Sequence, residues 1–199
     1  MADSSASAAD HAMERYAAGD DAAFGELYDA LAPRLHGFLV RQTRDVARAE
    51  DLVQQTFLQI HRARGRFIPG AEVMPWAFAI ARRLLIDGLR RRKREVLVAN
   101  EEDATGTPPV ATDAAADDLV QAQQLATRIQ QVLAGLPETQ RVAFELVKQE
   151  GLSIAEAAQV LGTTVSAVKL RAHRAYESLR RVLCDADLQA VPTKKEQTP

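Results

Sequence analysis

A segment of helical length, residues 75–94, joins an apolar face to a dense cluster of arginines. Its apolar residues recur near helical spacing, which predicts one face packed on a core: Trp76, Ile80, Leu84 and Leu89. Its other face and its end are basic: Arg82, Arg83, Arg90, Arg91, Arg92, Lys93 and Arg94. Guanidinium groups bind phosphate through parallel hydrogen bonds, so such a helix suits a polyanion. A solvated, arginine-rich surface helix is the alternative that this segment alone leaves open.

Charge is distributed unevenly along the 199 residues, although the formal net charge is only −2. Residues 62–94 contain ten Arg or Lys against two acidic residues. Residues 95–127 contain seven acidic residues and no Arg or Lys. Residues 169–181 are basic again, with five Arg or Lys against one Glu. Two basic modules that flank an acidic spacer indicate contact with nucleic acid.

The second basic segment has the pattern of a helix-turn-helix. Ser153 and Glu156 form a capping box at the start of a short helix. Gly162 suits the turn, and Thr164 can cap the last helix. In such motifs the second helix reads base edges in the major groove. An ordinary helical hairpin with a basic surface is the alternative. The expected DNA contacts are Thr164, Ser166, Ala167, Lys169, Arg171 and Arg174, with Val165, Val168, Ala172, Ala175, Leu179 and Val182 facing inward.

The N-terminal half contains two further amphipathic helices before the arginine-rich one. The first covers about residues 20–41, and Pro33 within it is expected to kink or split it. Asp45 is the expected N-cap of the second helix, whose inward face is Val46, Ala49, Leu52 or Val53, Phe57 and Ile60. Its outward stripe is rich in amides and is either solvated or a protein-docking face: Asp51, Gln54, Gln55 and Gln59.

These patterns predict an all-α fold with two small helical domains joined by a flexible acidic linker. With 47% hydrophobic and 26% charged residues, the chain can bury a core. The predicted divisions are a disordered N-terminal tail (1–18), a first helical domain (19–94), the linker (95–118), a second helical domain (119–185) and a polar C-terminal tail (186–199).

The sequence offers no pattern that is typical of an enzyme. It has no glycine-rich phosphate loop and no Cys/His metal spacing, and its four histidines are isolated. We therefore expect no catalytic residue, no metal, no cofactor and no small-molecule substrate. The single cysteine, Cys184, excludes an internal disulfide and favours the cytoplasm. No apolar run has the length of a membrane span.

Two stretches resemble known families. LPETQRVAFELVKQEGLSIAEAAQVLGTTVSAVKLRAHRAYESL resembles region 4 of a sigma factor, and also the DNA-binding domain of quorum-sensing-type response regulators. AEDLVQQTFLQIHRAR, then RF, then PWAFAIARRLLIDGLRRRKR resembles region 2 of a bacterial RNA polymerase sigma factor. With only a short linker between them, the two regions resemble the extracytoplasmic-function (ECF, group IV) sigma factors. The resemblance covers about residues 20–185.

The resemblance implies an alternative sigma factor that binds core RNA polymerase, recognises the −35 and −10 promoter elements and promotes DNA opening in a stress response. The stripe Asp51, Gln54, Gln55 and Gln59 would bind the β′ clamp helices. Region 4 would contact −35 DNA with the six residues given above and would also bind the β flap. An anti-sigma factor is the expected regulator. The −10 contacts would be Arg62, Arg66, Phe67, Trp76, Arg82, Arg83, Arg90, Arg91 and Arg92.

Two other functions remain open on the sequence alone. One is a free-standing helix-turn-helix regulator that binds duplex DNA as a dimer, without polymerase. The other is a sigma mimic that titrates an anti-sigma factor. Such mimics carry a receiver domain and need no basic strand-binding helix, whereas this chain lacks the first and has the second.

Overall fold

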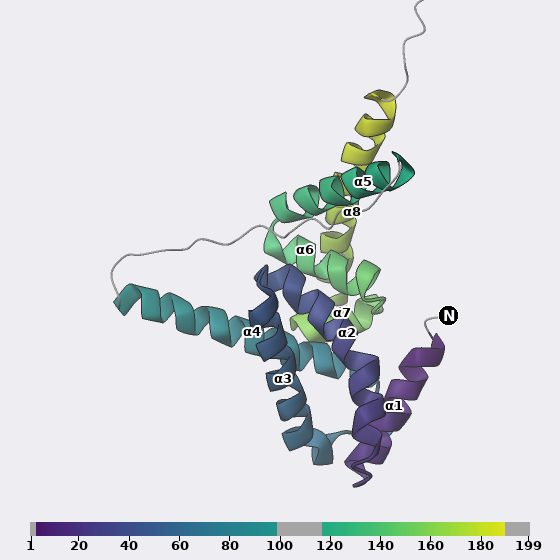
Figure 1. Ribbon diagram of the computed structural model, residues 1–199, viewed down its shortest axis with the longest axis vertical. Helices are drawn as coiled ribbons and strands as arrows, with labels where there is room; N and C mark the ends of the chain where they lie inside the picture. Colours follow the sequence, from purple (N-terminus) through teal and green to yellow (C-terminus); the bar gives the residue numbers. More distant parts are fainter. Residues whose placement is uncertain (1–2, 99–116, 190–199) are drawn as a thin grey trace, which may run out of the picture.

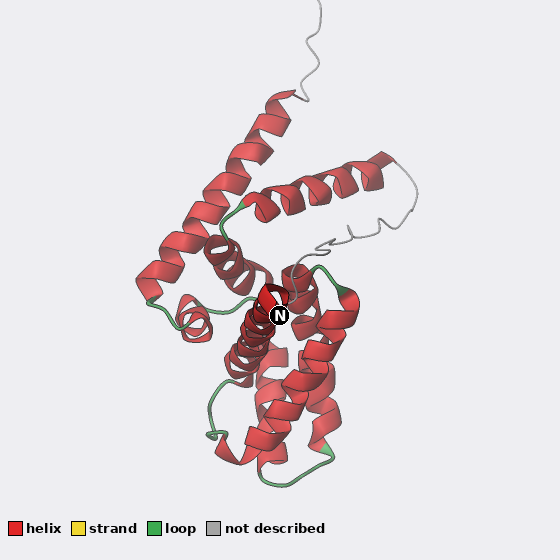
Figure 2. Cartoon of the chain, turned by 90° about the vertical axis from the view of Figure 1, so that its left-hand side faces the viewer, coloured by secondary structure: helices red, strands yellow, loops and turns green. Residues whose placement is uncertain are grey.

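The computed structural model describes residues 3–98 and 117–189, and none of these residues forms a strand (Figure 2). The predicted all-α fold class is confirmed. An N-terminal module holds α1 to α4, and a C-terminal module holds α5 to α8 (Figure 1). Most of the predicted linker and the end of the predicted C-terminal tail lie outside the described residues.

The N-terminal module begins with α1 (Asp3–Ala17), where we expected a disordered tail. That expectation is wrong. One face of α1 is fully buried at helical spacing: Ala9, Ala12, Met13 and Tyr16. This helix packs against α2 and α4. Alanines make half of the buried face, so the sequence carries little of the hydrophobic signal that marks an amphipathic helix.

The next two helices are α2 (Ala23–Thr43) and α3 (Val46–Ala63), and their junction uses local cap chemistry. Arg44 adopts φ 55° and ends α2, and the Asp45 side chain accepts a hydrogen bond from the Arg48 N–H at 3.1 Å. The predicted N-cap is therefore confirmed. Pro33 does not split α2. It lies on the exposed face, where water can bond the carbonyl that the proline leaves without an N–H partner.

The inward face of α3 is as predicted except at its start, because Val46 is 55% exposed. A short 3-10 helix, η1 (Arg64–Arg66), follows α3, and α4 (Val73–Val98) begins after a loop. Helix α4 continues four residues past the predicted domain boundary at 94.

The buried face of α4 differs from the face that the sequence predicts. Trp76, Ile80 and Leu84 are half-buried, and Leu89 is 46% exposed. The reason is size: small side chains let α4 approach its neighbours closely, and Phe78 meets Phe38 of α2 edge-on, with ring centroids 5.3 Å apart. The residues that are buried instead are Val73, Met74, Ala77, Phe78, Ala81 and Leu85.

The C-terminal module comprises α5 (Asp117–Gly135), α6 (Glu138–Phe144), the π-helical turn η2 (Glu145–Gln149), α7 (Ile154–Leu161) and α8 (Val165–Gln189). The Ser153–Glu156 capping box is confirmed, and so is the left-handed Gly162 at φ 60°. Thr164 caps α8 by accepting from the Ala167 N–H at 3.2 Å. The inward face of α8 holds Val168, Ala172, Ala175 and Leu179, whereas the first predicted member, Val165, is 52% exposed.

The π turn η2 has a structural consequence for two glutamates. A π turn bonds residue i to i+5, and the Glu150 N–H donates to the Glu145 carbonyl at 2.9 Å. Glu145 and Glu150 therefore lie on the same side of the turn. Both are buried, with 2% and 6% exposure. Gly151, at φ 67°, then ends the turn.

Met13→Ala should lower the free energy of unfolding by about 2–5 kcal/mol, because the Met13 side chain is fully buried between α1 and the rest of the module. Urea denaturation followed by circular dichroism measures this. The matched control is His11→Ala on the exposed face of α1, which should stay within about 0.5 kcal/mol. Equal stability of both variants would mean that α1 does not pack as described.

Candidate nucleic-acid interface

The predicted polymerase-docking stripe lies on the outer face of α3. Asp51, Gln54 and Gln55 are exposed, and Gln59 is half-buried. Leu58, on the same helix, is 46% exposed. Amides and one carboxylate beside an exposed leucine make a surface that can hydrogen-bond to a partner and bury apolar area with it. The structure brings the four predicted residues onto one side of the module.

The loop between η1 and α4, residues 66–72, is called the −10 loop below because it carries two of the predicted −10 contacts. Arg66 is exposed and Phe67 is half-buried, with its ring centroid 5.5 Å from that of Trp76. Ile68 is 71% exposed. The loop thus presents a cation, the edge of an aromatic pair and an aliphatic side chain together. Such a set can stack on and enclose an unpaired base.

The predicted arginines of α4 differ in their surroundings. Arg83 and Arg90 are exposed and lie 3.8 and 3.9 Å from the Asp87 carboxylate, and Arg91 and Arg92 are exposed as well. Arg62 lies near the end of α3 and is exposed. Exposed cations along one helix suit a phosphate backbone, because each neutralised phosphate releases condensed counterions.

Arg48 of α3 joins this basic surface, although no pattern in the sequence pointed to it. Its guanidinium lies beside Gly88 of α4, where an added Cβ would be 3.4 Å from Nη2. Burial lowers the pKa of Arg48, and the nearby Arg92 lowers it further. Asp45 opposes these two effects, and a bound polyanion would favour the charged form of Arg48 further.

The predicted −35 contacts lie on the first turns of α8. Thr164, Ser166, Lys169 and Arg174 are exposed, and Ala167 and Arg171 are half-buried. α7 and α8 contact each other across the Gly162 turn in the order of a helix-turn-helix. The arrangement puts small side chains at the start of α8 and cations one and two turns later.

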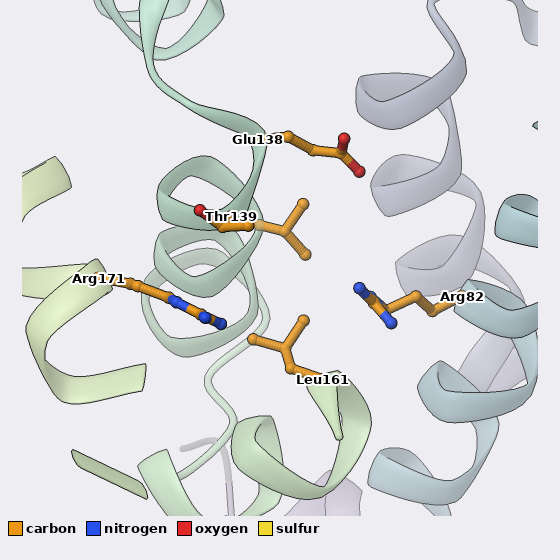
Figure 3. A pocket seen from close by; sticks show the side chains of 6 residues that line it. Arg82, Glu138, Thr139, Leu161 and Arg171 are labelled. Carbon is orange, nitrogen blue, oxygen red and sulfur yellow. The ribbon is translucent and has the colours of Figure 1, made fainter. Parts of the chain in front are cut away.

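A pocket between the modules brings a predicted −10 residue and a predicted −35 residue together. Arg82 from α4 and Arg171 from α8 point toward one another across it, with Glu138 above (Figure 3). Burial lowers the pKa of Arg82; Glu138 opposes this effect and Arg171 adds to it. Thr139, Val142 and Leu161 complete the lining. The two surfaces that the sequence predicts to contact DNA therefore meet at this pocket in this conformation.

Buried charges join the modules a short distance away. Arg41 of α2 bonds the Glu150 carboxylate and lies 3.9 Å from that of Glu145. Arg34 of α2 donates to the Glu150 carbonyl and pairs with its carboxylate at 3.7 Å. Burial raises the pKa of both glutamates, and the arginines partly offset this effect. Two further groups face Glu145: the amide of Gln42 and the guanidinium of Arg141, which lies 3.8 Å away.

A carboxyl pair crosses the same boundary. Glu72, at the end of the −10 loop, lies close to Glu156 of the capping box. Hydrogen bonding to Glu156, repulsion from its charge, partial burial and the nearby Asp10 together raise the pKa of Glu72 to about 7. Burial alone would raise the pKa of Glu156, but hydrogen bonds from Glu72 and Ser153 outweigh it and lower it. The two carboxyls therefore bring the end of the −10 loop close to the start of α7.

Family models match both modules: Sigma-70 region 2 over residues 27–95 and Sigma-70 region 4 over residues 126–179. The RNA polymerase sigma factor CarQ of Myxococcus xanthus is 40% identical over 177 residues, which cover 89% of this chain and 98% of CarQ. The chain belongs to the ECF RNA polymerase sigma factors. The ECF sigma factor SigF of Caulobacter vibrioides is 35% identical over 85% of this chain and 90% of its own length.

Two solved structures resemble the chain. The sigma factor RpoE, in complex with the anti-sigma factor NepR from Bartonella quintana, has a TM-score of 0.65 and 27% identity, and covers 81% of this chain and 96% of its own. CnrH, in complex with the cytosolic domain of CnrY, has a TM-score of 0.61 and 25% identity, and the match covers 90% of this chain and 99% of CnrH. The sigma-factor resemblance drawn from the sequence is confirmed, and the quorum-sensing-type response regulators are not among these relatives.

The region 2 match leaves out α1. Residues 27–95 include most of α2, all of α3 and nearly all of α4, but none of α1. Sequence reasoning missed α1 and the interface pair formed by Arg34 and Arg41 with the buried glutamates. No local pattern could have found the pair, because more than 100 residues separate its members.

Within residues 8–92 and 126–181, no group of three or more His, Cys, Asp or Glu could hold a metal ion. No helix among the described residues is long and apolar enough to cross a membrane. The side chain of Cys184 lies outside those ranges.

Arg41→Ala should weaken the association of the two modules. The substitution removes one of the two arginines that pair with the Glu150 carboxylate, and separation of the modules would let water hydrate that carboxylate. We expect a cost of about 2 kcal/mol, below the roughly 3–5 kcal/mol of a fully buried pair, because Arg34 and Gln42 remain. Small-angle scattering should show a shift to larger radii of gyration. Arg180→Ala, which removes an exposed pair with Glu177, is the control and should leave the profile unchanged.

Glu72→Gln should flatten the pH dependence of stability. The folded-state pKa of Glu72 is about 7 and its ordinary value is 4.5, so its contribution is full below pH 4.5 and is lost as the pH rises through about 7. Glutamine keeps a donor at all pH values. Melting temperatures from pH 5 to 8.5 should therefore fall less in the variant. Glu145 and Glu150 titrate in both proteins, so parallel curves would contradict the Glu72–Glu156 bond.

Proposed function

We propose that this chain binds core RNA polymerase through the exposed stripe of α3 and directs it to promoters. The −10 loop and α4 contact the −10 element, and the first turns of α8 contact the −35 duplex. The observation that carries the proposal is the 40% identity to a sigma factor over nearly its whole length, with both DNA-facing surfaces present. The chain supplies recognition, and the chemistry of RNA synthesis belongs to the polymerase, so we propose no enzymatic activity of its own.

Promoter opening has a cost that these surfaces can offset. Taking a base out of the stack costs about a few kcal/mol. Favourable contacts of the base with a pocket, and of the strand with a cationic groove, can offset this cost. Around the −10 loop the side chains offered are Phe67, paired with Trp76, and the exposed Ile68, whereas Phe78 is fully buried. With so few aromatic surfaces, we expect weak intrinsic melting. Transcription should therefore depend strictly on a good −10 and −35 match.

The described conformation is closed with respect to a promoter. The −10 and −35 elements lie roughly 25 base pairs apart, about 85 Å at about 3.4 Å per pair. Arg82 and Arg171 line one pocket, so their surfaces cannot reach both elements together. We propose that the modules separate on the polymerase, at the Arg34, Arg41, Glu145 and Glu150 contacts. Residues 99–116, which lie outside the described residues, connect the modules along the chain.

An anti-sigma factor is the proposed regulator. In one of the solved structures compared above the sigma factor RpoE is in complex with an anti-sigma factor, and in the other CnrH is in complex with the cytosolic domain of CnrY. A partner that binds the closed form and not the open form would shift the population toward it. We also propose that the chain acts in the cytoplasm, where the polymerase is found. The free-standing regulator is the second candidate, and family membership does not favour it.

The decisive experiment mixes the purified chain with bacterial core polymerase, isolates the complex, and tests run-off transcription from promoter fragments selected by that complex. We expect stable binding and a promoter-specific product. The triple variant Asp51→Ala, Gln54→Ala, Gln55→Ala should lose core binding while its circular dichroism is unchanged. Duplex binding by the chain alone, without any product in the presence of core, would favour the free-standing regulator.

Neutralising Arg90, Arg91 and Arg92 to alanine should weaken promoter binding and flatten its dependence on salt. Each lost phosphate contact reduces the slope of log K against log salt by about 0.7–0.9, so a decrease of about 2–3 is expected. Binding to core polymerase should be spared. The control is Arg180→Ala with Arg181→Ala, outside the predicted contacts on α8. Equal losses of promoter and core binding would mean that the cluster is structural.

A further inference from the structure

Helix α1 carries two carboxylates that bind the backbone of the −10 loop and the start of α4. The Gly70 N–H donates to Glu14 Oε1 at 2.6 Å, and the Val73 N–H donates to Asp10 Oδ1 at 2.7 Å. The first bond joins residues 56 positions apart and the second joins residues 63 apart. Together the two bonds hold the Pro-Gly turn of the loop and the first residue of α4.

The loop has little internal bonding to fix its shape. Within it, the Phe67 N–H donates to the Arg64 carbonyl at 3.1 Å and the Ala71 N–H to the Ile68 carbonyl at 3.0 Å. Gly70 adopts φ +81°, and the space where a Cβ would lie is open, with no atom within 4 Å. The third tie, Glu72 to Glu156, crosses to the C-terminal module and is lost when the modules separate. In the open form the contacts with α1 therefore remain.

Carboxylates beside a DNA-contacting loop need a reason, because they repel phosphate. Ionised oxygens that accept from backbone N–H groups form charge-assisted hydrogen bonds, which are among the stronger kinds. Asp10 also caps α4 from a separate helix, since the first N–H groups of a helix, here that of Val73, have no partner within it. A second set of contacts holds the same end of the module together. The Arg64 Cζ atom lies 4.9 Å from the centroid of the Tyr16 ring, and Arg64 Nη1 lies 3.5 Å from Asp21 Oδ1.

We propose that Asp10 and Glu14 are positioning residues for −10 recognition. They hold the −10 loop in one conformation, so that Phe67 and Ile68 meet an unpaired base without first being ordered. A loop that is already ordered loses less conformational freedom on binding, which is the general gain from preorganisation. The proposal rests on the sigma-factor function proposed above. Helix α1 precedes the residues matched by the region 2 model, so nothing in that match assigns it this role.

The test uses full-length chain with core polymerase and a pool of promoter fragments randomised in the −10 and −35 segments. Retained fragments are sequenced. In Asp10→Ala with Glu14→Ala, base preference at one or two −10 positions should fall about tenfold, the loss expected for a charge-assisted bond. Preferences in the −35 segment should stay unchanged. Asp10→Asn with Glu14→Gln should retain most of the −10 preference, because an amide oxygen still accepts from an N–H, although in a weaker, neutral hydrogen bond.

The matched control is Asp29→Ala with Glu50→Ala, which removes two exposed helical carboxylates elsewhere on the module. It should select as the wild type does. Full −10 preference in the double alanine variant would overturn the proposal. So would equal loss of −10 and −35 preferences, since that indicates general misfolding.

A measurement without DNA separates this proposal from the proposed function. Amide hydrogen exchange at Gly70 and Val73 should be about tenfold faster in Asp10→Ala with Glu14→Ala, and should change much less in the asparagine and glutamine variant. Unchanged exchange in the alanine variant overturns the positioning role even if the chain is a sigma factor. A wild-type complex that selects no sequence, with exchange changed as expected, overturns the function and leaves the loop support standing.

Discussion

The two modules of this sigma factor depend on one set of buried charges. Glu145 and Glu150 are almost fully buried, and an ionised carboxylate is stable there only with cations close by. Arg34 and Arg41 supply these cations from the other module. The hydrogen bonding of these groups is incomplete, because the Nε atoms of Arg41 and Arg141 are buried without a hydrogen-bond partner. Since water can replace every one of these contacts, such an interface can form and open within one folded protein.

One continuous hydrophobic cluster runs through both modules, and α4 packs against α7, so opening the interface also breaks apolar contacts. We propose that the helices of each module nevertheless keep their packing within the module. Phe38 packs on Phe78 within one module, and Leu146 and Val168 are buried in the other. The surfaces that would contact DNA are built on helices of these cores, so they persist whether the modules are together or apart. The interface changes only their separation. In the described conformation Arg82 and Arg171 line one pocket; in the open form that we propose, each would be free for its own DNA element.

Sequence reasoning succeeded where the chemistry is local. The capping box at Ser153, the turn at Gly162 and the N-cap at Asp45 each depend on residues within a few positions. It failed where packing between distant helices decides. Met13 and Tyr16 anchor α1 together with alanines, and the buried face of α4 uses Ala77 and Ala81, which a count of large apolar residues passes over. The glutamate–arginine interface has no sequence signature at all.

We propose above all that the chain is closed alone and open on the polymerase. Spin labels at Asp29→Cys in α2 and Tyr176→Cys in α8, both exposed, would report it by pulsed electron paramagnetic resonance in a Cys184→Ser background. We predict one short, narrow distance distribution for the free protein. With core polymerase and promoter DNA, we predict a shift to a much longer distance. The same short distance in both states would contradict this opening.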